Sequence, residues 1–256
     1  MAAGQPPFEG VGVALVTLFD RDGDLDAGAT AEHAARLVEA GVRAVVVAGS
    51  TGEAAALEPD ERSALLAAVR GAVGGRVPVL AGTGAPSARQ AVALSRRAVD
   101  DGADALLVLS PPRTDDPRPY YEAVAAAVDV PVLAYHYPAV SAPGIPVDVV
   151  AELPVAGIKD STGDPSRLAL ELDGTGGAVY TGSAALLLQA RAMGAAGAIL
   201  ALANVDLDGC VRAWEGDGRC QRELVSGHRS GALAGVAGLK RALAALHGTC
   251  PVTRLG

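Results

Sequence analysis

The chain has 256 residues, of which 50% are hydrophobic and only 3% aromatic, and its formal net charge is -8. This length can bury one large core, which small and branched aliphatic side chains must fill, and barrels of this size commonly form a single domain. The charges are spread over many short acidic and basic pairs. They form no basic stripe of the kind that binds phosphate backbones, which makes nucleic acid an unexpected partner.

The sequence carries no signature of a membrane segment, a metal site or a disulfide framework. The N-terminal MAAGQPPFEG lacks the basic and apolar regions of a signal peptide, and no later stretch runs eighteen residues without a charge or a breaker. Cys210, Cys220 and Cys250 are too few and too scattered for disulfides or zinc, and four dispersed histidines show no ligand spacing. We therefore expect a cytoplasmic protein that contacts no membrane and needs no metal or other cofactor.

Short apolar runs alternate eight times with longer alanine-rich stretches of helical period, which is typical of parallel strands joined by crossover helices. Each run is apolar enough to be buried on both faces of a sheet. The expected strands are Val11 to Thr17, Ala44 to Ala48, Val77 to Ala81, Ala105 to Leu109, Val130 to Tyr135, Val155 to Ile158, Ala178 to Thr181 and Ala198 to Ala201.

The stretches between these runs predict helices. Pro59 fits a first helical turn, because proline lacks only an N–H that would be unpaired there. Gly41 and Gly102 follow expected helix ends as left-handed caps. The expected helices are Ala29 to Glu39, Pro59 to Val73, Ala88 to Asp101, Arg118 to Val128, Ala184 to Met193, Val205 to Trp214 and a tail from Arg222 to Leu246 that Gly227, Gly231, Gly235 and Gly238 interrupt.

Eight evenly spaced units favour a closed (β/α)8 barrel over a doubly wound open sheet, which shows the same alternation and is the second possibility. We expect the barrel in residues 1–215 and a short helical segment in residues 216–256 that packs on it, in one domain overall. In such a barrel the active site lies at the C-terminal ends of the strands.

The chain has two lysines, one of them Lys159, and nineteen arginines. Because arginine serves as the general cation in this sequence, a lysine indicates a specific requirement for an amine. Lys159 follows the apolar run PVAGI at the C-terminal end of the sixth expected strand. Desolvation there lowers the pKa of an amine and creates a nucleophile near neutral pH, which a guanidinium cannot become. A structural salt bridge with Asp160 explains the position equally well. Lys240, in the context GLKRAL, is expected to be a surface charge without a role.

Further candidate site residues stand at the ends of other strands. The segment Gly49 to Glu53 follows the second strand, and its backbone N–H groups and two hydroxyls can hold a carboxylate, although such turns are common. Tyr135 ends the fifth strand, where its phenol can relay protons or simply belong to the core. Gly182, Ser183 and the strand Ala198 to Ala201 leave room for a ligand.

Six short segments are informative together. They are ALVTLF at Ala14 to Phe19, GSTGE at Gly49 to Glu53, AGTG at Ala81 to Gly84, YHYP at Tyr135 to Pro138, GIKDSTGD at Gly157 to Asp164 and GAILALANV at Gly197 to Val205. In this order they resemble the dihydrodipicolinate synthase and N-acetylneuraminate lyase family of class I aldolases. The resemblance extends from Ala14 to about Val205 and is weaker in the tail.

The resemblance implies a role for each matching position. Lys159 would be the Schiff-base lysine and Tyr135 the phenol that relays protons. Ser50 would assist Tyr135, and Ser50 and Thr51 would hold the carboxylate of a 2-oxo acid such as pyruvate. The family also implies a homotetramer or a homodimer. The other residues expected to bind substrate are Gly49, Thr17, Gly182, Ser183, Ile199 and Tyr137.

Two departures from the family pattern bear on the substrate. Synthases that condense pyruvate with aspartate semialdehyde carry an arginine shortly after the tyrosine-bearing strand, where this chain reads PAVSA at Pro138 to Ala142. They also carry a tyrosine pair after strand 4, where this chain has Pro111-Pro112-Arg113. The pattern is closer to the sugar-acid lyases and 2-keto-3-deoxy-acid aldolases. Arg113 is either a ligand for a distal anion or a solvated loop cation.

These features favour a lyase that reversibly cleaves a 4-hydroxy-2-oxo acid into pyruvate and an aldehyde through an imine on Lys159. One alternative is 4-hydroxy-tetrahydrodipicolinate synthase, or a related dehydratase, which shares the imine step. Another is a barrel without catalytic activity that binds a 2-oxo acid.

Overall fold

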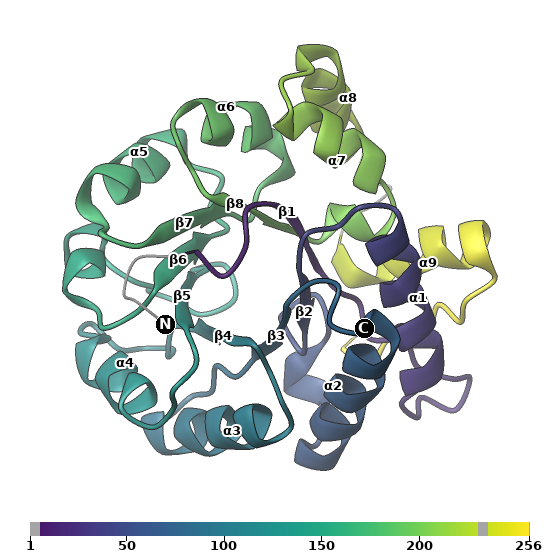
Figure 1. Cartoon of the computed structure of the whole chain (residues 1–256), viewed down its shortest axis with the longest axis horizontal. Coiled ribbons are helices and arrows are strands. Elements are labelled where there is room, and N and C mark those ends of the chain that lie inside the picture. Colours follow the sequence, from purple (N-terminus) through teal and green to yellow (C-terminus); the bar gives the residue numbers. More distant parts are fainter. Residues whose placement is uncertain (1–5, 230–234, 256) are drawn as a thin grey trace.

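The chain folds into a closed barrel of eight parallel strands with helices on its outside (Figure 1). The computed structural model describes residues 6–229 and 235–255. Each strand pairs in parallel with the next, and the eighth strand closes the ring by pairing Gly10 with Gly197 and Val13 with Leu200. The predicted (β/α)8 barrel is confirmed, and the open doubly wound sheet is excluded.

The eight strands overlap the eight expected runs, and the first, second, third and fifth are shorter than expected. The first ends at Ala14 instead of Thr17, since its register with the second strand stops there. The strands are β1 (Gly10–Ala14), β2 (Val45–Val47), β3 (Val79–Gly82), β4 (Ala105–Leu109), β5 (Val132–His136), β6 (Gly157–Asp160), β7 (Ala178–Thr181) and β8 (Gly197–Leu200).

Helices occupy most of the connections, and the expected one from Ala184 to Met193 divides into a short 3-10 turn and a helix. Gly41 and Gly102 have φ angles of 97° and 92°, as the predicted left-handed caps require. The helices are α1 (Ala27–Glu39), α2 (Pro59–Val73), α3 (Ala88–Asp100), α4 (Arg118–Ala125), α5 (Pro165–Gly174), α6 (Leu187–Ala192), α7 (Leu207–Trp214), α8 (Gly218–Arg229) and α9 (Gly235–His247).

The sequence analysis missed α5, although its start is well marked. Pro165 occupies its first turn, and the Asp164 side chain accepts hydrogen bonds from the backbone N–H groups of Ser166 and Arg167. The tail expected from Arg222 to Leu246, with interruptions at glycines, forms two separate helices, α8 and α9; the expected interruptions at Gly227 and Gly238 were wrong, because these residues lie inside the helices, and Gly235 begins α9. The expected interruption at Gly231 lies outside the described residues.

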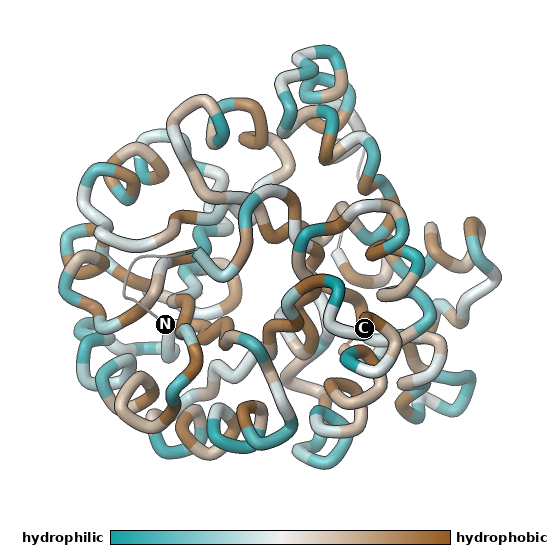
Figure 2. Tube along the Cα trace, viewed as in Figure 1, coloured by the Kyte–Doolittle hydropathy of each residue, from teal (hydrophilic) through white to brown (hydrophobic). Residues whose placement is uncertain are grey.

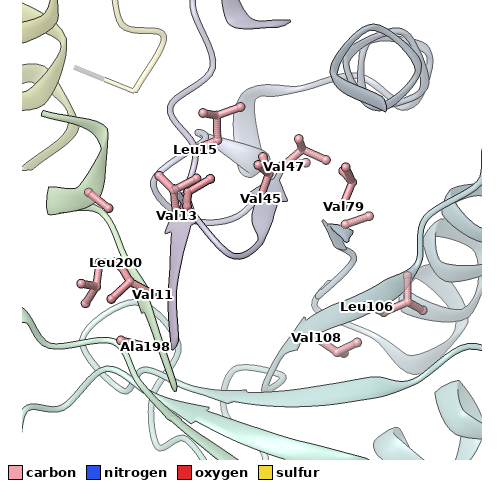
Figure 3. Packing of buried hydrophobic residues seen from close by; sticks show 14 of the residues in the cluster. Val11, Val13, Leu15, Val45, Val47, Val79, Leu106, Val108, Ala198 and Leu200 are labelled. Atoms are coloured by element: carbon pink, nitrogen blue, oxygen red, sulfur yellow. The ribbon is translucent and has the colours of Figure 1, made fainter. Parts of the chain in front are cut away.

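Two layers of apolar side chains hold the barrel together. Inward-facing residues such as Leu80, Leu107 and Leu133 fill its interior, while Figure 3 shows Val11 and Val13 of β1 in the layer between strands and helices. Hydrophobic residues accordingly follow the strands, and hydrophilic ones gather on the outer parts of the helices (Figure 2).

The C-terminal helix α9 packs on the barrel beside α1 (Figure 1). Leu239 and Leu243 of α9 form a buried cluster with Val16 and Leu18, which follow β1. Lys240 lies between these two leucines and is fully buried. The expectation that Lys240 is a surface charge was therefore wrong. Its burial depends on an acidic partner distant in sequence, described below.

We predict opposite effects of alanine at two glycines. A Cβ on Gly157 of β6 would lie 2.1 Å from the Ala178 carbonyl oxygen, so Gly157→Ala must push β6 and β7 apart. It should lower the free energy of unfolding by at least the roughly 1–3 kcal/mol typical of an overpacked core. The matched control is Gly71→Ala in exposed α2, where a Cβ meets no atom within 4 Å. It should raise stability by about 0.5–1 kcal/mol. Urea denaturation measures both, and equal effects would contradict the packing described.

Candidate active site

A cavity of about 410 Å³ opens at the C-terminal ends of β5 to β8 and beside the turn that follows β2. Eight of the expected site residues line it, namely Ser50, Thr51, Tyr135, Tyr137, Lys159, Gly182, Ser183 and Ile199. The structure thus brings together residues of β5, β6 and β8 with residues of the loops that follow β2, β5 and β7. Thr17 and Gly49 lie outside this lining.

Lys159 projects into the cavity from β6 with only 4% of its surface exposed. Burial lowers the pKa of its amine from the ordinary 10.5 to about 7. Within residues 6–229 and 235–255, no carboxylate lies within ion-pair distance of Lys159. The alternative of a salt bridge with Asp160 is therefore excluded, because the Asp160 carboxylate lies 2.7 Å from Arg167 Nε instead.

Behind β6, Asp160 belongs to a buried charged cluster with Arg167 and Glu171. Its second oxygen accepts hydrogen bonds from the backbone N–H and the hydroxyl of Thr162. Arg167 Nε also lies 2.8 Å from a carboxylate oxygen of Glu171, which is fully buried. Burial and the Asp160 charge raise the pKa of Glu171 from 4.5 to about 8, against the opposing effect of Arg167. The guanidinium thus neutralises Asp160, while burial favours the protonated form of the Glu171 carboxyl at neutral pH.

Tyr135 lies next to Lys159, because the two residues are direct partners in the β5–β6 register. The Lys159 amine lies 4.3 Å from the centre of the Tyr135 ring. Burial raises the pKa of the phenol, while hydrogen bonds with the Ser161 and Ser50 hydroxyls act against that rise. The Tyr135 hydroxyl lies 3.4 Å from Ser161 Oγ. A phenol, an amine and two hydroxyls therefore share one partly enclosed space.

Sequence analysis did not select Ser161, although it lies two residues after Lys159 and lines the cavity. Ser161 fits here because glycine is the residue directly after β7. A Cβ on Gly182 would lie 2.0 Å from Ser161 Oγ and 3.0 Å from Lys159 Cε. Only glycine at this position leaves space for both side chains. Two signals in the sequence could have indicated Ser161. It lies two residues after Lys159, which places both on the same face of the chain, and the small residue Gly182 follows the neighbouring strand.

The turn that carries Ser50 and Thr51 is supported from below by Thr17. The Thr17 hydroxyl donates a 2.7 Å hydrogen bond to the Gly52 carbonyl oxygen, and Thr17 is 1% exposed. A Cβ on Gly52 would lie 3.0 Å from the Leu15 carbonyl oxygen, so the turn packs directly on the chain after β1. In this structure Thr17 contacts the turn and not the cavity.

The outer part of the cavity is uncharged. Lys159 is the only Lys, Arg, Asp or Glu side chain among the described lining residues, which otherwise carry hydroxyls or apolar groups. Val140, 55% exposed, stands at the rim. Arg113 is exposed on the neighbouring loop and is absent from the lining, which favours its interpretation as a loop cation.

Two tyrosines after β4 are structural. The hydroxyl of Tyr120 donates to the Ala85 carbonyl oxygen, and the hydroxyl of fully buried Tyr121 donates to that of Val108. Both phenols therefore have backbone partners and neither lines the cavity.

In the described part of the chain, no helix is both long and apolar enough to cross a membrane. Over the same residues, His, Cys, Asp and Glu side chains form no group of three or more that could hold a metal ion.

A parallel barrel with a polar cavity at the C-terminal ends of its strands has the architecture of a barrel enzyme. The family model described as dihydrodipicolinate synthetase family matches residues 7–224. An uncharacterized DapA-like lyase of Halobacterium salinarum is 39% identical over 243 residues, which cover 91% of this chain and 80% of that protein. A 4-hydroxy-tetrahydrodipicolinate synthase of Corynebacterium aurimucosum is 39% identical over 213 residues, covering 79% and 70%. The chain belongs to the dihydrodipicolinate synthetase family of lyases, as the sequence motifs predicted.

Solved structures agree with this assignment. YagE, an Escherichia coli prophage protein of this family in complex with pyruvate, has a TM-score of 0.89 at 27% identity, covering 96% of this chain and 91% of that one. A dihydrodipicolinate synthase of Acinetobacter baumannii, also complexed with pyruvate, has a TM-score of 0.87 at 28% identity, covering 98% and 94%. A monomeric dihydrodipicolinate synthase variant has a TM-score of 0.87 at 25% identity, covering 97% and 90%. A homotetramer or homodimer therefore stays a prediction.

We predict that Glu171→Gln changes how stability depends on pH. Between pH 4.5 and 8 the unfolded chain releases the Glu171 proton before the folded chain does, so wild-type stability falls as pH rises through this window. Glutamine cannot ionise and keeps an acceptor for Arg167. The variant should therefore gain roughly 1–3 kcal/mol relative to wild type from pH 5 to pH 8, since one pKa unit is about 1.4 kcal/mol. Denaturation at both pH values measures this, and a constant difference would contradict a protonated Glu171.

Proposed function

We propose that this protein is a class I lyase that forms an imine between Lys159 and a 2-oxo acid, and that it reversibly cleaves a 4-hydroxy-2-oxo acid into pyruvate and an aldehyde. The observation that carries the proposal is the buried Lys159 amine. Its pKa is about 7, and it has no carboxylate partner among the described residues. Such an amine is a nucleophile at neutral pH, whereas an exposed lysine is not.

The cavity offers a binding mode for the 2-oxo acid. Ser50 and Thr51 present hydroxyls at one side of the cavity, and Lys159 enters from β6. With the carboxylate held by these hydroxyls and by backbone N–H groups of the turn, the C2 ketone faces the amine. Two structural relatives were solved with pyruvate, which supports this class of ligand.

The chemical steps then follow from the side chains present. The neutral Lys159 amine attacks C2, and the adduct takes up one proton from solvent as it loses water, which gives a protonated imine. The same proton returns to solvent when hydrolysis restores the neutral amine. Tyr135 relays the proton that leaves the C4 hydroxyl, with the hydroxyls of Ser50 and Ser161 as its hydrogen-bond partners. The electrons of the C3–C4 bond move into the iminium group, and the aldehyde departs. The proton taken from the C4 hydroxyl is balanced by the one that C3 of the enamine gains, and water then releases pyruvate and restores the amine.

The uncharged outer cavity favours an aldehyde that carries hydroxyls over one that carries a carboxylate or phosphate. An anionic tail would be desolvated there without a cationic partner among the described lining residues of the outer cavity, which is costly. Ser161 and Ser183 instead offer hydroxyls. This supports a 2-keto-3-deoxy sugar acid as the substrate. The synthase and dehydratase alternatives share the imine and differ in the second substrate, while a non-catalytic protein would bind pyruvate without turnover.

We predict that borohydride with pyruvate traps an adduct on Lys159. Intact mass and peptide mapping should locate one modified lysine, and Lys159→Ala should abolish the adduct. The initial trapping rate should rise with pH through about 7, because the neutral amine is the nucleophile. Wild type treated with borohydride alone is the control. A stable fold without any adduct would sink the imine mechanism, and an adduct without cleavage of any sugar acid would favour the non-catalytic alternative.

We predict that wild type condenses pyruvate with glyceraldehyde more efficiently than with aspartate semialdehyde. Val140→Arg places a cation at the cavity rim and should raise kcat/KM for aspartate semialdehyde by about tenfold, the effect of one new charge-assisted contact. Val140→Gln, of similar reach but uncharged, is the matched control and should not. Wild-type preference for aspartate semialdehyde would instead support the synthase alternative.

A further inference from the structure

Glu53, the last residue of the GSTGE turn, is bound by the C-terminal region of the chain. Its carboxylate is 1% exposed and accepts three hydrogen bonds. One oxygen lies 2.6 Å from the Lys240 amine of α9. The other accepts from the backbone N–H groups of Arg254 and Leu255, at 2.7 and 2.8 Å. We call Glu53, Lys240, Arg254 and Leu255 the C-terminal clamp.

The C-terminal clamp is buried and well supplied with partners. Lys240 is fully buried, donates a further 2.8 Å hydrogen bond to the Val252 carbonyl oxygen and lies over the Phe19 ring. The guanidinium of Arg254 lies over the same ring and forms two hydrogen bonds with Glu61 of α2, at 2.6 and 2.7 Å. Glu61 has its own place in α2, where it completes a capping box.

The clamp acts on a turn whose position decides where a carboxylate can bind. Glu53 has a φ of 53°, an uncommon conformation for a residue with a side chain, which its surroundings must hold in place. Its N–H donates to the Ser50 carbonyl oxygen at 3.1 Å. The side-chain anchor of the turn is thus connected directly to Ser50. The same helix α9 contributes Gly235, Val236 and Leu239 to the cavity wall.

From this geometry we infer that the C-terminal clamp positions Ser50 and Thr51 for the carboxylate of the 2-oxo acid. Lys240, Glu53 and the tail are positioning residues, since none of them has a side chain in the cavity lining. Lys159 is held independently by β6. The inference rests on the proposed function, and it predicts that loosening the clamp weakens binding of pyruvate and leaves the reactivity of bound pyruvate unchanged.

The test measures how borohydride trapping of the Lys159 adduct depends on pyruvate concentration, in two variants of the C-terminal clamp and in one control variant. The double variant Glu53→Gln with Lys240→Met removes both charges and so leaves no buried charge unpaired. Arg254→Gln releases the tail from Glu61 at a side chain that is 20% exposed, and it keeps the test valid if the double variant fails to fold. Arg219→Gln, which breaks an exposed pair with Glu223, is the matched control.

Both clamp variants should raise the pyruvate concentration that gives half-maximal trapping by about threefold to thirtyfold, as expected for coupling of this kind. Trapping at saturating pyruvate and its pH midpoint should stay as in wild type, and Arg219→Gln should change nothing. Half-saturation like that of wild type in folded clamp variants would overturn the inference. So would a loss of trapping at saturating pyruvate or a shifted pH midpoint. Absence of trapping in wild type would instead refute the proposed function.

Discussion

The burial of the Lys159 amine, with no carboxylate of residues 6–229 and 235–255 within ion-pair distance, is the constraint on which the site depends. An ammonium group in this position would lose its hydration and gain no carboxylate, so the neutral form of Lys159 is favoured. Asp160, the adjacent residue, cannot reverse this because Arg167 and Thr162 occupy its oxygens. The charged cluster behind β6 therefore matters as much as the cavity in front of it. Because Asp160 is bound within this cluster, its carboxylate forms no ion pair with Lys159.

The barrel makes this arrangement possible through register and small residues. Tyr135 and Lys159 are neighbours because β5 and β6 pair at these positions. Gly182 provides the space that Lys159 and Ser161 share, while Gly157 lets β6 approach β7 below them. The side chains of Tyr135 and Lys159 thus lie at the C-terminal end of a barrel interior that mainly apolar residues fill. Helix α9 of the C-terminal region forms part of the cavity wall. Through Glu53, the C-terminal region also anchors the turn that carries Ser50 and Thr51.

Much of the fold and part of the site were predictable from the sequence. Alternation of apolar runs gave all eight strands, because strands buried on both faces are apolar throughout. The scarcity of lysine indicated Lys159, and the resemblance to the aldolase family implied roles for Tyr135 and Ser50. Lys240 could not be predicted, since its burial depends on Glu53, 187 residues away in sequence. Local pattern also could not show that Thr17 contacts the turn and not the cavity, because that depends on how two loops pack.

The two-lysine composition permits a direct measurement of the central claim. NMR of protein labelled with ¹³C at lysine Cε should give two resonances, and Lys159→Met assigns them. We predict that the Lys159 resonance titrates near pH 7 in the free protein and shifts when pyruvate is added. A Lys159 resonance that keeps its ammonium position up to about pH 10, the ordinary range for lysine, would contradict the account.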